Sequence, residues 1–281
     1  MPYQHILYEI RERIATITFN RPKTLNSLDQ PLLEEWVDAL RAAENDASVR
    51  VVVLKGAGRA FCSGYTMERS REYADITSFE GWLGRQDWTR KVSTPWELRK
   101  PVIAQVHGWC VSGGVEIIGQ CDITIAAEDA RFYNPHVRGW AISYLHMGVY
   151  HMGPQWTKIM MFTGDPIRGK TAERIGLVAK AVPGERLEQT VQRLASRIAL
   201  VPSELLAFNK AIVNRAVEGM GRRALLDAGV ELDVIARTNN RFIEDFRKLA
   251  DEKGWKEAFD AVDRPFKELP LPFDDPDETT D

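Results

Sequence analysis

Apolar residues follow two different spacings along the chain, and these spacings predict where strands and helices lie. Short runs of β-branched and aliphatic residues predict strands at 14–19, 51–54, 102–106 and 122–126. Between the first two runs, apolar residues recur at helical spacing over 29–44, where Asp29 is a candidate N-cap. Strands that alternate with helices in this way indicate βα units and a mainly parallel sheet.

The second half of the chain has an almost entirely helical spacing from Ile167 onward. The expected helices cover 185–198, 203–217, 222–237 and a charged stretch over 241–266. The segment after them is rich in Pro and Asp, a composition typical of disordered chains. We therefore expect a core domain over 1–200, a helical region over 201–268 and a disordered tail over 269–281.

Composition narrows the class of protein without identifying it. With 281 residues, of which 44% are hydrophobic and 27% charged, the chain is long enough to bury a sizeable core. Its net charge of −3 argues against a general nucleic-acid surface. No stretch approaches 18 apolar residues, and the N-terminus has no apolar signal core, so we expect a cytoplasmic protein without a membrane partner.

The three cysteines, Cys62, Cys110 and Cys121, are an odd number without CxxC spacing or a paired histidine motif. This pattern indicates neither a disulfide framework nor a zinc site, and no metal is expected. Cys62 and Cys110 stand in apolar turns, where a packed thiol is the simpler interpretation.

The most informative segment is the glycine-rich turn that follows the strand at 102–106. Gly113 and Gly114 let the backbone approach a ligand closely, and N–H groups at the start of a helix can stabilise negative charge. Glu116 stands about one helical turn after Gly113, so it can project toward the same side. These features predict an oxyanion hole beside an acid/base, although a tight turn with a surface glutamate has the same spacing.

A second glycine turn favours the functional interpretation. The strand at 51–54 leads into a loop in which Tyr65 follows Gly64, so the N–H of Tyr65 can also face a ligand. Two such N–H groups, from Gly113 and Tyr65, are what acyl-transfer or enolate chemistry requires.

At this point the chain resembles the crotonase, or enoyl-CoA hydratase/isomerase, superfamily. The matching segments are Asn20–Leu28, Ala60–Gly64, Ser112–Glu116, Cys121–Ala126, Thr163–Pro166 and Gly176–Val178. Their order and spacing fit from about residue 5 to residue 268. The resemblance implies an α/β fold with a ββα superhelix core and a C-terminal helical trimerisation region, with trimers often stacked as hexamers.

The resemblance also implies an acyl-CoA thioester as substrate and a place in fatty-acid metabolism. Coenzyme A would enter as part of the substrate, and no separate cofactor is expected. Arg21 and Lys23 are then candidates for its phosphates, and Arg59 has the same status. The full set of candidate binding residues is Arg21, Lys23, Leu25, Ala60, Cys62, Gly64 and Gly114.

One departure from the family pattern concerns the second catalytic glutamate. The family's Phe-x-x-Pro-Glu pattern corresponds here to Phe132–His136, which places His136 at the expected glutamate. Counting back from Gly164 instead places Tyr144 near that position, and either way no carboxylate fills it. Besides Glu116, the candidate catalytic residues are therefore His136, Tyr144 and His146, with His151 a further possibility. His107 is expected to make a structural hydrogen bond.

The region from Glu68 to Lys100 interleaves charged side chains with aromatic ones. It has two interpretations, a solvated amphipathic helix packed by tryptophans or a lid that shapes a bulky acyl pocket, as the corresponding segment does in crotonase-like enzymes.

Three functions remain open at the level of sequence. The first is an enoyl-CoA hydratase that stabilises a thioester enolate, with Glu116 as acid/base. The second is a family member with other chemistry, such as C–C bond hydrolysis of a β-diketone, ring-opening, isomerisation or decarboxylation, using Glu116 or a histidine. The third is an acyl-CoA-binding protein without catalytic activity.

Overall fold

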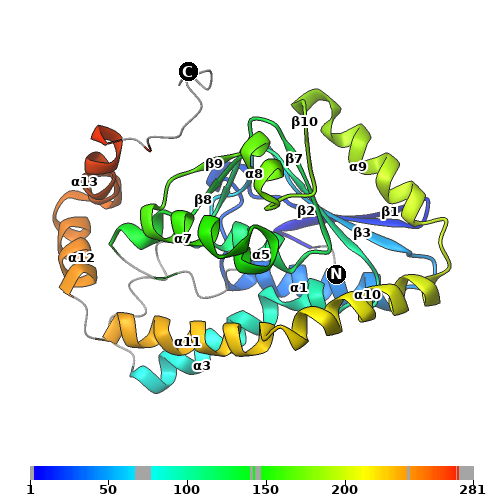
Figure 1. Cartoon of the computed structure of the whole chain (residues 1–281), viewed down its shortest axis with the longest axis horizontal. Helices are drawn as coiled ribbons and strands as arrows, with labels where there is room; N and C mark the ends of the chain where they lie inside the picture. The colour runs from blue at the N-terminus through cyan, green and yellow to red at the C-terminus, as the bar shows by residue number, and fades with distance from the viewer. Residues whose placement is uncertain are drawn as a thin grey trace.

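Two β-sheets form the body of the protein, and helices cover them (Figure 1). The computed structural model describes residues 3–66, 77–139, 142, 147–238, 241–269 and 271. The large sheet has the strand order β1 (Ile6–Arg11), β2 (Ile14–Phe19), β3 (Val51–Gly56), β5 (Val102–Val106), β7 (Ile123–Ala127) and β10 (Lys180–Val182). The small sheet has the order β4 (Ala60–Cys62), β6 (Trp109–Val111), β8 (Arg131–Tyr133) and β9 (Ile167–Arg168).

Three successive strand pairs are divided between the two sheets. β3, β5 and β7 belong to the large sheet, while β4, β6 and β8, which follow them in turn, belong to the small one. The short helix α5 (Gly113–Gln120) follows β6, and the 3-10 helix η2 (Pro135–Arg138) follows β8. The chain therefore advances by a repeated strand–strand–helix unit.

Parallel pairing in this repeat places the loops of interest together. β4 pairs with β6 and β6 pairs with β8, both in parallel. The carboxyl ends of parallel strands lie at the same edge, so the loops after these three strands meet there.

The large sheet confirms the expected strands and their parallel pairing. Parallel pairs run from β2 through β3, β5 and β7 to β10, and only β1 is antiparallel to its neighbour. Every residue of β5 is buried, as its unbroken apolar run predicts. The expected first helix is α1 (Gln30–Asn45), and the Asp29 carboxylate caps it by accepting the Leu32 N–H at 3.0 Å.

The helical C-terminal half contains two strands that the spacing does not predict. β9 and β10 are only two and three residues long, too short to show a period of their own. They form because β8 and β7 offer free edges for pairing. The expectation of an almost purely helical region after Ile167 is therefore wrong at these two places.

The remaining helices have the following bounds. They are η1 (Pro22–Thr24), α3 (Ser78–Val92), α4 (Thr94–Glu97), α6 (Gly148–His151), α7 (Gly153–Thr163), α8 (Gly169–Ile175), α9 (Gly184–Ile198), α10 (Ser203–Gly219), α11 (Arg222–Thr238), α12 (Arg241–Lys253) and α13 (Trp255–Glu268). α9 packs against β3, β5 and β7, and α11 lies alongside α3 (Figure 1).

The charged stretch over 241–266 is two helices rather than one. Gly254, with φ +86°, separates α12 from α13, and only a glycine adopts such a conformation without strain. The two helices share a small apolar cluster of their own, built around Phe246, Ala250 and Ala258. The tail expected to be disordered falls almost entirely outside the described residues.

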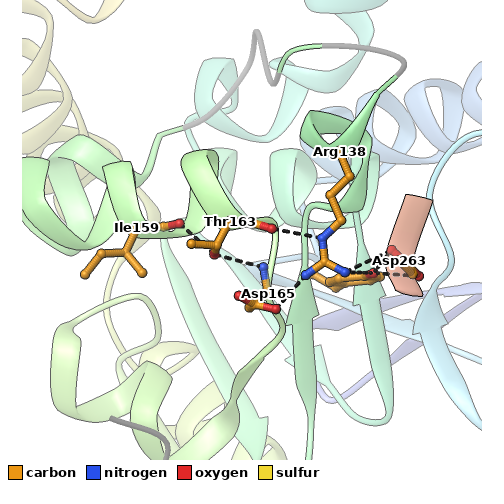
Figure 2. Close-up of polar contacts among 6 residues, drawn as sticks. Arg138, Ile159, Thr163, Asp165 and Asp263 are labelled. Carbon is orange, nitrogen blue, oxygen red and sulfur yellow. Dashed lines mark hydrogen bonds and ion pairs between the residues drawn. The ribbon is translucent and has the colours of Figure 1, made fainter. Parts of the chain in front are cut away.

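Arg138 at the end of η2 joins α13 to the body of the protein (Figure 2). Its buried guanidinium lies 2.5 Å from a carboxylate oxygen of Asp165 and 2.9 Å from one of Asp263 on α13. It also donates to the carbonyl oxygen of Thr163 at 2.9 Å and lies 4.1 Å from the ring centroid of Phe266. In the described part of the chain, no helix is long and apolar enough to cross a membrane.

Candidate active site

The carboxyl edge of the small sheet brings together three loops, which follow β4, β6 and β8. The first carries Tyr65, the second carries Gly113 and leads to Glu116, and the third carries His136. Four of the predicted site residues, from distant parts of the sequence, therefore share one edge.

The turn after β6 requires glycine. Ser112 adopts φ 50° and ψ −112°, a rare conformation for a residue with a side chain, and α5 starts directly after it. A Cβ atom at Gly113 would lie 2.7 Å from Leu28 Cδ1 and from Tyr65 Cζ. As the first residue of α5, Gly113 has an N–H with no acceptor inside the helix, as an oxyanion donor needs.

The turn after β4 packs against the turn after β6. Gly64 has φ +86°, and a Cβ atom there would lie 2.9 Å from Ser112 Cβ. Leu28 donates to the Gly64 carbonyl at 2.7 Å, and Thr66 donates to the Leu28 carbonyl at 3.0 Å. Because N–H groups alternate in direction along an extended chain, the N–H of Tyr65 points away from Leu28.

Glu116 is buried in the first turn of α5, with 1% of its surface exposed. The interpretation as a surface glutamate is therefore wrong. Burial raises the pKa of its carboxyl to about 7, against an opposing hydrogen bond from the hydroxyl of Tyr65. A carboxyl with a pKa near neutrality can both accept and release a proton at physiological pH.

A second group of charges surrounds Glu116 at longer range. Asp233 on α11 is fully buried and accepts from Arg85 Nε at 2.6 Å and from Arg237 Nε at 2.8 Å. The negative charge of Asp233 raises the pKa of Glu116, while those of Arg85 and Arg237 lower it. Burial alone would raise the pKa of Asp233, but its two arginine partners lower it below its usual value.

Tyr65 is held in place by its ring as well as by its backbone. The ring lies edge-on to the buried indole of Trp88 on α3, with 5.1 Å between centroids. The ring of Tyr65 also lies against the backbone of Gly113. α3 therefore packs Trp88 against the site. This helix belongs to the charged region that was expected to be a solvated helix or a lid, of which residues 67–76 lie outside the described part.

The segment Pro22–Leu28 borders the same edge. The buried Asn26 side chain donates to the carbonyl oxygens of Ala57 at 2.9 Å and Ala60 at 2.8 Å. Ser63 donates to the Leu25 carbonyl at 2.9 Å. The candidate binding residues Leu25, Ala60, Cys62 and Gly64 thus lie in two adjoining segments.

The candidate cations at this border differ in their surroundings. Arg21 lies 2.5 Å from a carboxylate oxygen of Asp29, so it already has an anionic partner. Lys23 and Arg59 are exposed. Gly114 lies on the inner side, where a Cβ atom would be 3.0 Å from Cys62 Cβ.

The histidines and Tyr144 are placed very differently. His136 is buried in η2, directly after the β8 loop, whereas Tyr144 and His146 lie outside the described residues. His151 Nε2 lies 3.3 Å from the Gly119 carbonyl, near the far end of α5, and burial lowers the pKa of its imidazole. His107 Nε2 lies 2.8 Å from the Gly58 carbonyl, which confirms the expected structural hydrogen bond.

The three cysteines are buried free thiols, which confirms the packed thiols expected at Cys62 and Cys110. Burial raises the pKa of Cys62 to about 12, so this thiol stays protonated beside the site. Within the described ranges, no group of three His, Cys, Asp or Glu side chains is arranged to hold a metal ion.

Four residues near the site are absent from the sequence prediction. Arg85 and Trp88 lie in the charged and aromatic region expected to be a solvated helix or a lid, but its weak amphipathicity does not single them out. Asp233 belongs to a helix more than a hundred residues away from Glu116 in the sequence, so no local pattern connects it with the site. Asn134 follows β8 and is fully buried, with neither side-chain polar atom bonded within the described structure. The one feature of the sequence that could have identified Asn134 is its position close to His136, a residue that one alignment places at the family's second glutamate.

Comparison with known proteins agrees with this geometry. Residues 9–244 match the family model described as enoyl-CoA hydratase/isomerase. A short-chain-enoyl-CoA hydratase of Clostridium acetobutylicum is 34% identical over 224 residues, which cover 78% of this chain and 84% of that protein. A crotonyl-CoA hydratase of Syntrophomonas wolfei is 33% identical over the same shares of the two chains.

Solved structures show the same fold. An enoyl-CoA hydratase/isomerase from Xanthobacter autotrophicus superposes with a TM-score of 0.88 at 32% identity, covering 96% of this chain and 100% of that one. An enoyl-CoA hydratase from Mycobacterium smegmatis superposes with a TM-score of 0.89 at 28% identity, covering 94% of each chain. The crotonase-like core and its C-terminal helical region are thereby confirmed, and the chain belongs to the enoyl-CoA hydratase/isomerase family.

Proposed function

We propose that this protein is an enoyl-CoA hydratase, which adds water across the double bond of a 2-enoyl-CoA thioester. The observation that carries the proposal is the buried Glu116, one helical turn after the glycine turn at Gly113. Two relatives whose names include hydratase activity toward such thioesters support it.

In this reaction, the N–H groups of Gly113 and Tyr65 stabilise the enolate oxygen of the thioester. The first belongs to the start of α5 and the second to the β4 loop that packs against it. Each such donor contributes roughly 3 kcal/mol to transition-state stabilisation. Glu116, with its pKa raised to about 7 by burial, takes a proton from the attacking water.

The acyl-CoA thioester would follow the border between Leu25 and the Ala60–Gly64 segment. The exposed Lys23 and Arg59 are the candidate cations for its phosphates, because Arg21 already pairs with Asp29. Cys62 and Gly114 would lie at the inner end of this path, where the two loops are in close contact.

The protein is also proposed to form homotrimers, alone or stacked as hexamers. The support is an exposed apolar row on α10, in which Leu205, Phe208 and Ile212 are 52%, 66% and 66% exposed. Ile235 on α11 is similarly exposed, at 67%. Such a contiguous apolar face is typical of an interface between subunits. Light scattering at micromolar concentration should show a trimer or hexamer; a monomer contradicts the proposal.

The missing second glutamate favours one alternative function. A family member with a single catalytic carboxylate can move a double bond, decarboxylate its substrate or cleave a C–C bond, and here His136 or Tyr144 stands where the second glutamate is expected. In isomerisation, Glu116 alone would carry a proton from one carbon to another.

The test is a panel of enoyl-CoA, β-oxoacyl-CoA and free β-diketone substrates with products identified by mass spectrometry. We expect hydration of enoyl-CoA, and a loss of at least about a hundredfold in kcat for Glu116→Gln. The control is Glu188→Gln, a carboxylate on α9 that bonds Gln105 and Lys55 and should have wild-type activity. Isomerised or cleaved products would favour the alternative chemistry, and binding of CoA esters without turnover would favour an acyl-CoA-binding protein.

A further inference from the structure

Addition of water to an enoyl thioester requires two proton transfers, one from water and one to the α-carbon. Glu116 can serve the first. The position expected for a second glutamate is occupied by His136 or Tyr144, depending on the alignment, and neither is a carboxylate, so the donor for the α-carbon has to be found in the structure.

The side chain of Tyr65 reaches the reacting edge from the β4 loop. Its hydroxyl donates a hydrogen bond to Oε2 of Glu116. Its ring lies so close to the oxyanion turn that a Cβ atom on Gly113 would be 2.7 Å from Cζ, the carbon that bears the hydroxyl. The Tyr65 side chain therefore contacts both the candidate base and the turn that is expected to hold the thioester oxygen.

The position of this ring is fixed from several sides. Tyr65 pairs with Leu28 through backbone hydrogen bonds of the neighbouring residues, and its ring packs edge-on against Trp88. A side chain held by both backbone and ring contacts gives a proton donor a defined position.

We propose that the Tyr65 hydroxyl is the second proton-transfer group of this enzyme and delivers the proton to the α-carbon. The proposal rests on the hydratase function proposed above. It assigns to one residue two roles, an oxyanion donor through its backbone N–H and an acid through its side chain.

The proton balance closes between the two residues. Water loses a proton to the Glu116 carboxylate as its oxygen bonds to the β-carbon, and the double-bond electrons move toward the thioester oxygen. The Tyr65 hydroxyl then gives its proton to the α-carbon as the enolate returns to a thioester. The protonated Glu116 passes its proton to the Tyr65 oxygen along their hydrogen bond, which restores both groups.

The electrostatic surroundings suit this return step. Burial and the charge of Asp233 keep the pKa of Glu116 near 7, between that of an ordinary glutamate and that of a tyrosine. A carboxyl in this range can accept a proton from activated water and still release it to a tyrosinate.

Tyr65→Phe is a precise test, because it removes the hydroxyl while it preserves the ring and the backbone N–H. Tyr3→Phe is the matched control, since the Tyr3 hydroxyl also donates to a carboxylate, that of Asp38 at 2.7 Å on α1. With crotonyl-CoA as substrate, we expect kcat to fall about a hundredfold in Tyr65→Phe, with KM within about twofold of wild type. Tyr3→Phe should have the wild-type kcat.

The pH profile separates proton transfer from mere positioning of Glu116. The hydrogen bond from Tyr65 lowers the pKa of Glu116, so its loss in Tyr65→Phe should raise that pKa. The acidic limb of the profile of kcat against pH should therefore move to higher pH. If Tyr65 transfers the proton, kcat stays about a hundredfold low on the plateau above that limb. Recovery of wild-type kcat on the plateau would overturn the proposal.

A second measurement does not depend on hydration. Butanoyl-CoA, a saturated thioester, is incubated in D2O and deuterium entry at its α-carbon is followed by NMR. We expect exchange with wild type and its loss with Tyr65→Phe, while His136→Ala still exchanges. Equal exchange in wild type and Tyr65→Phe, or its loss only in His136→Ala, would overturn the role of Tyr65. Exchange that is lost in Tyr65→Phe, together with no hydration of crotonyl-CoA by wild type, would overturn the hydratase function but support the role of Tyr65.

Discussion

Two clusters of arginine and aspartate side chains, each around a buried central residue, hold helices of this protein together, and they differ in the charge at their centre. In the first, Asp233 accepts from Arg85 and Arg237, so one carboxylate joins α11 to α3. In the second, Arg138 contacts Asp165 and Asp263, so one guanidinium joins η2 to α13 (Figure 2).

The difference in charge has a consequence for catalysis. The first cluster has an excess positive charge and lies close enough to Glu116 to influence its pKa. The second has an excess negative charge and is not among the largest influences on the pKa of that carboxyl. The same pair of residue types therefore adjusts a proton-transfer group in one place and fastens a terminal helix in the other.

The largest effect is expected from breaking the second cluster. Arg138→Met leaves the Asp165 and Asp263 carboxylates without their shared cation and should lower the free energy of unfolding by about 3 to 5 kcal/mol. Chemical denaturation measures it, with Arg264→Met as control, since that exposed side chain lies 3.9 Å from its carboxylate partner. A change below about 1 kcal/mol would show that α13 does not depend on this contact.

The next largest effect is expected from Glu116→Gln, which should change the free energy of unfolding by about 3 kcal/mol at most, in a way that depends on pH. Burial raises the pKa of Glu116 in the folded protein to about 7 from 4.5, so the folded state binds this proton more tightly than the unfolded chain does. Stability from this group is complete below pH 4.5 and is lost as pH rises through about 7.

The glutamine variant lacks this titration, so the comparison with wild type should depend on pH. At pH 5 the two proteins should unfold at similar denaturant concentrations, and at pH 8.5 the variant should be the more stable. Guanidinium titrations at both values measure the difference. An identical difference at the two pH values would contradict a raised pKa of Glu116.

The smallest effect expected is a change in the pH profile when the first cluster loses its carboxylate. Asp233→Asn removes the negative charge that raises the pKa of Glu116 and leaves Arg85 and Arg237, which lower it. The acidic limb of kcat/KM should therefore move to lower pH. Asp263→Asn, the matching change in the second cluster, should leave that limb in place, and a shift of both would refute the contrast between the two clusters.

Local sequence patterns were sufficient for most of the framework. The apolar runs of β2, β3, β5 and β7 and the capped α1 were predicted within a few residues, since each depends on its own period and termini. The glycines at 64 and 113 were also identified, because a close backbone approach accepts no side chain there.

What tertiary structure alone decided is which distant side chains meet. Parallel pairing of β4, β6 and β8 brings Tyr65, Glu116 and His136 to one edge, and the packing of α11 on α3 adds Asp233 and Arg85 behind them. The burial of Glu116, and with it the raised pKa, is a property of that assembly. No local period encodes it, because desolvation depends on everything that surrounds the carboxyl in space.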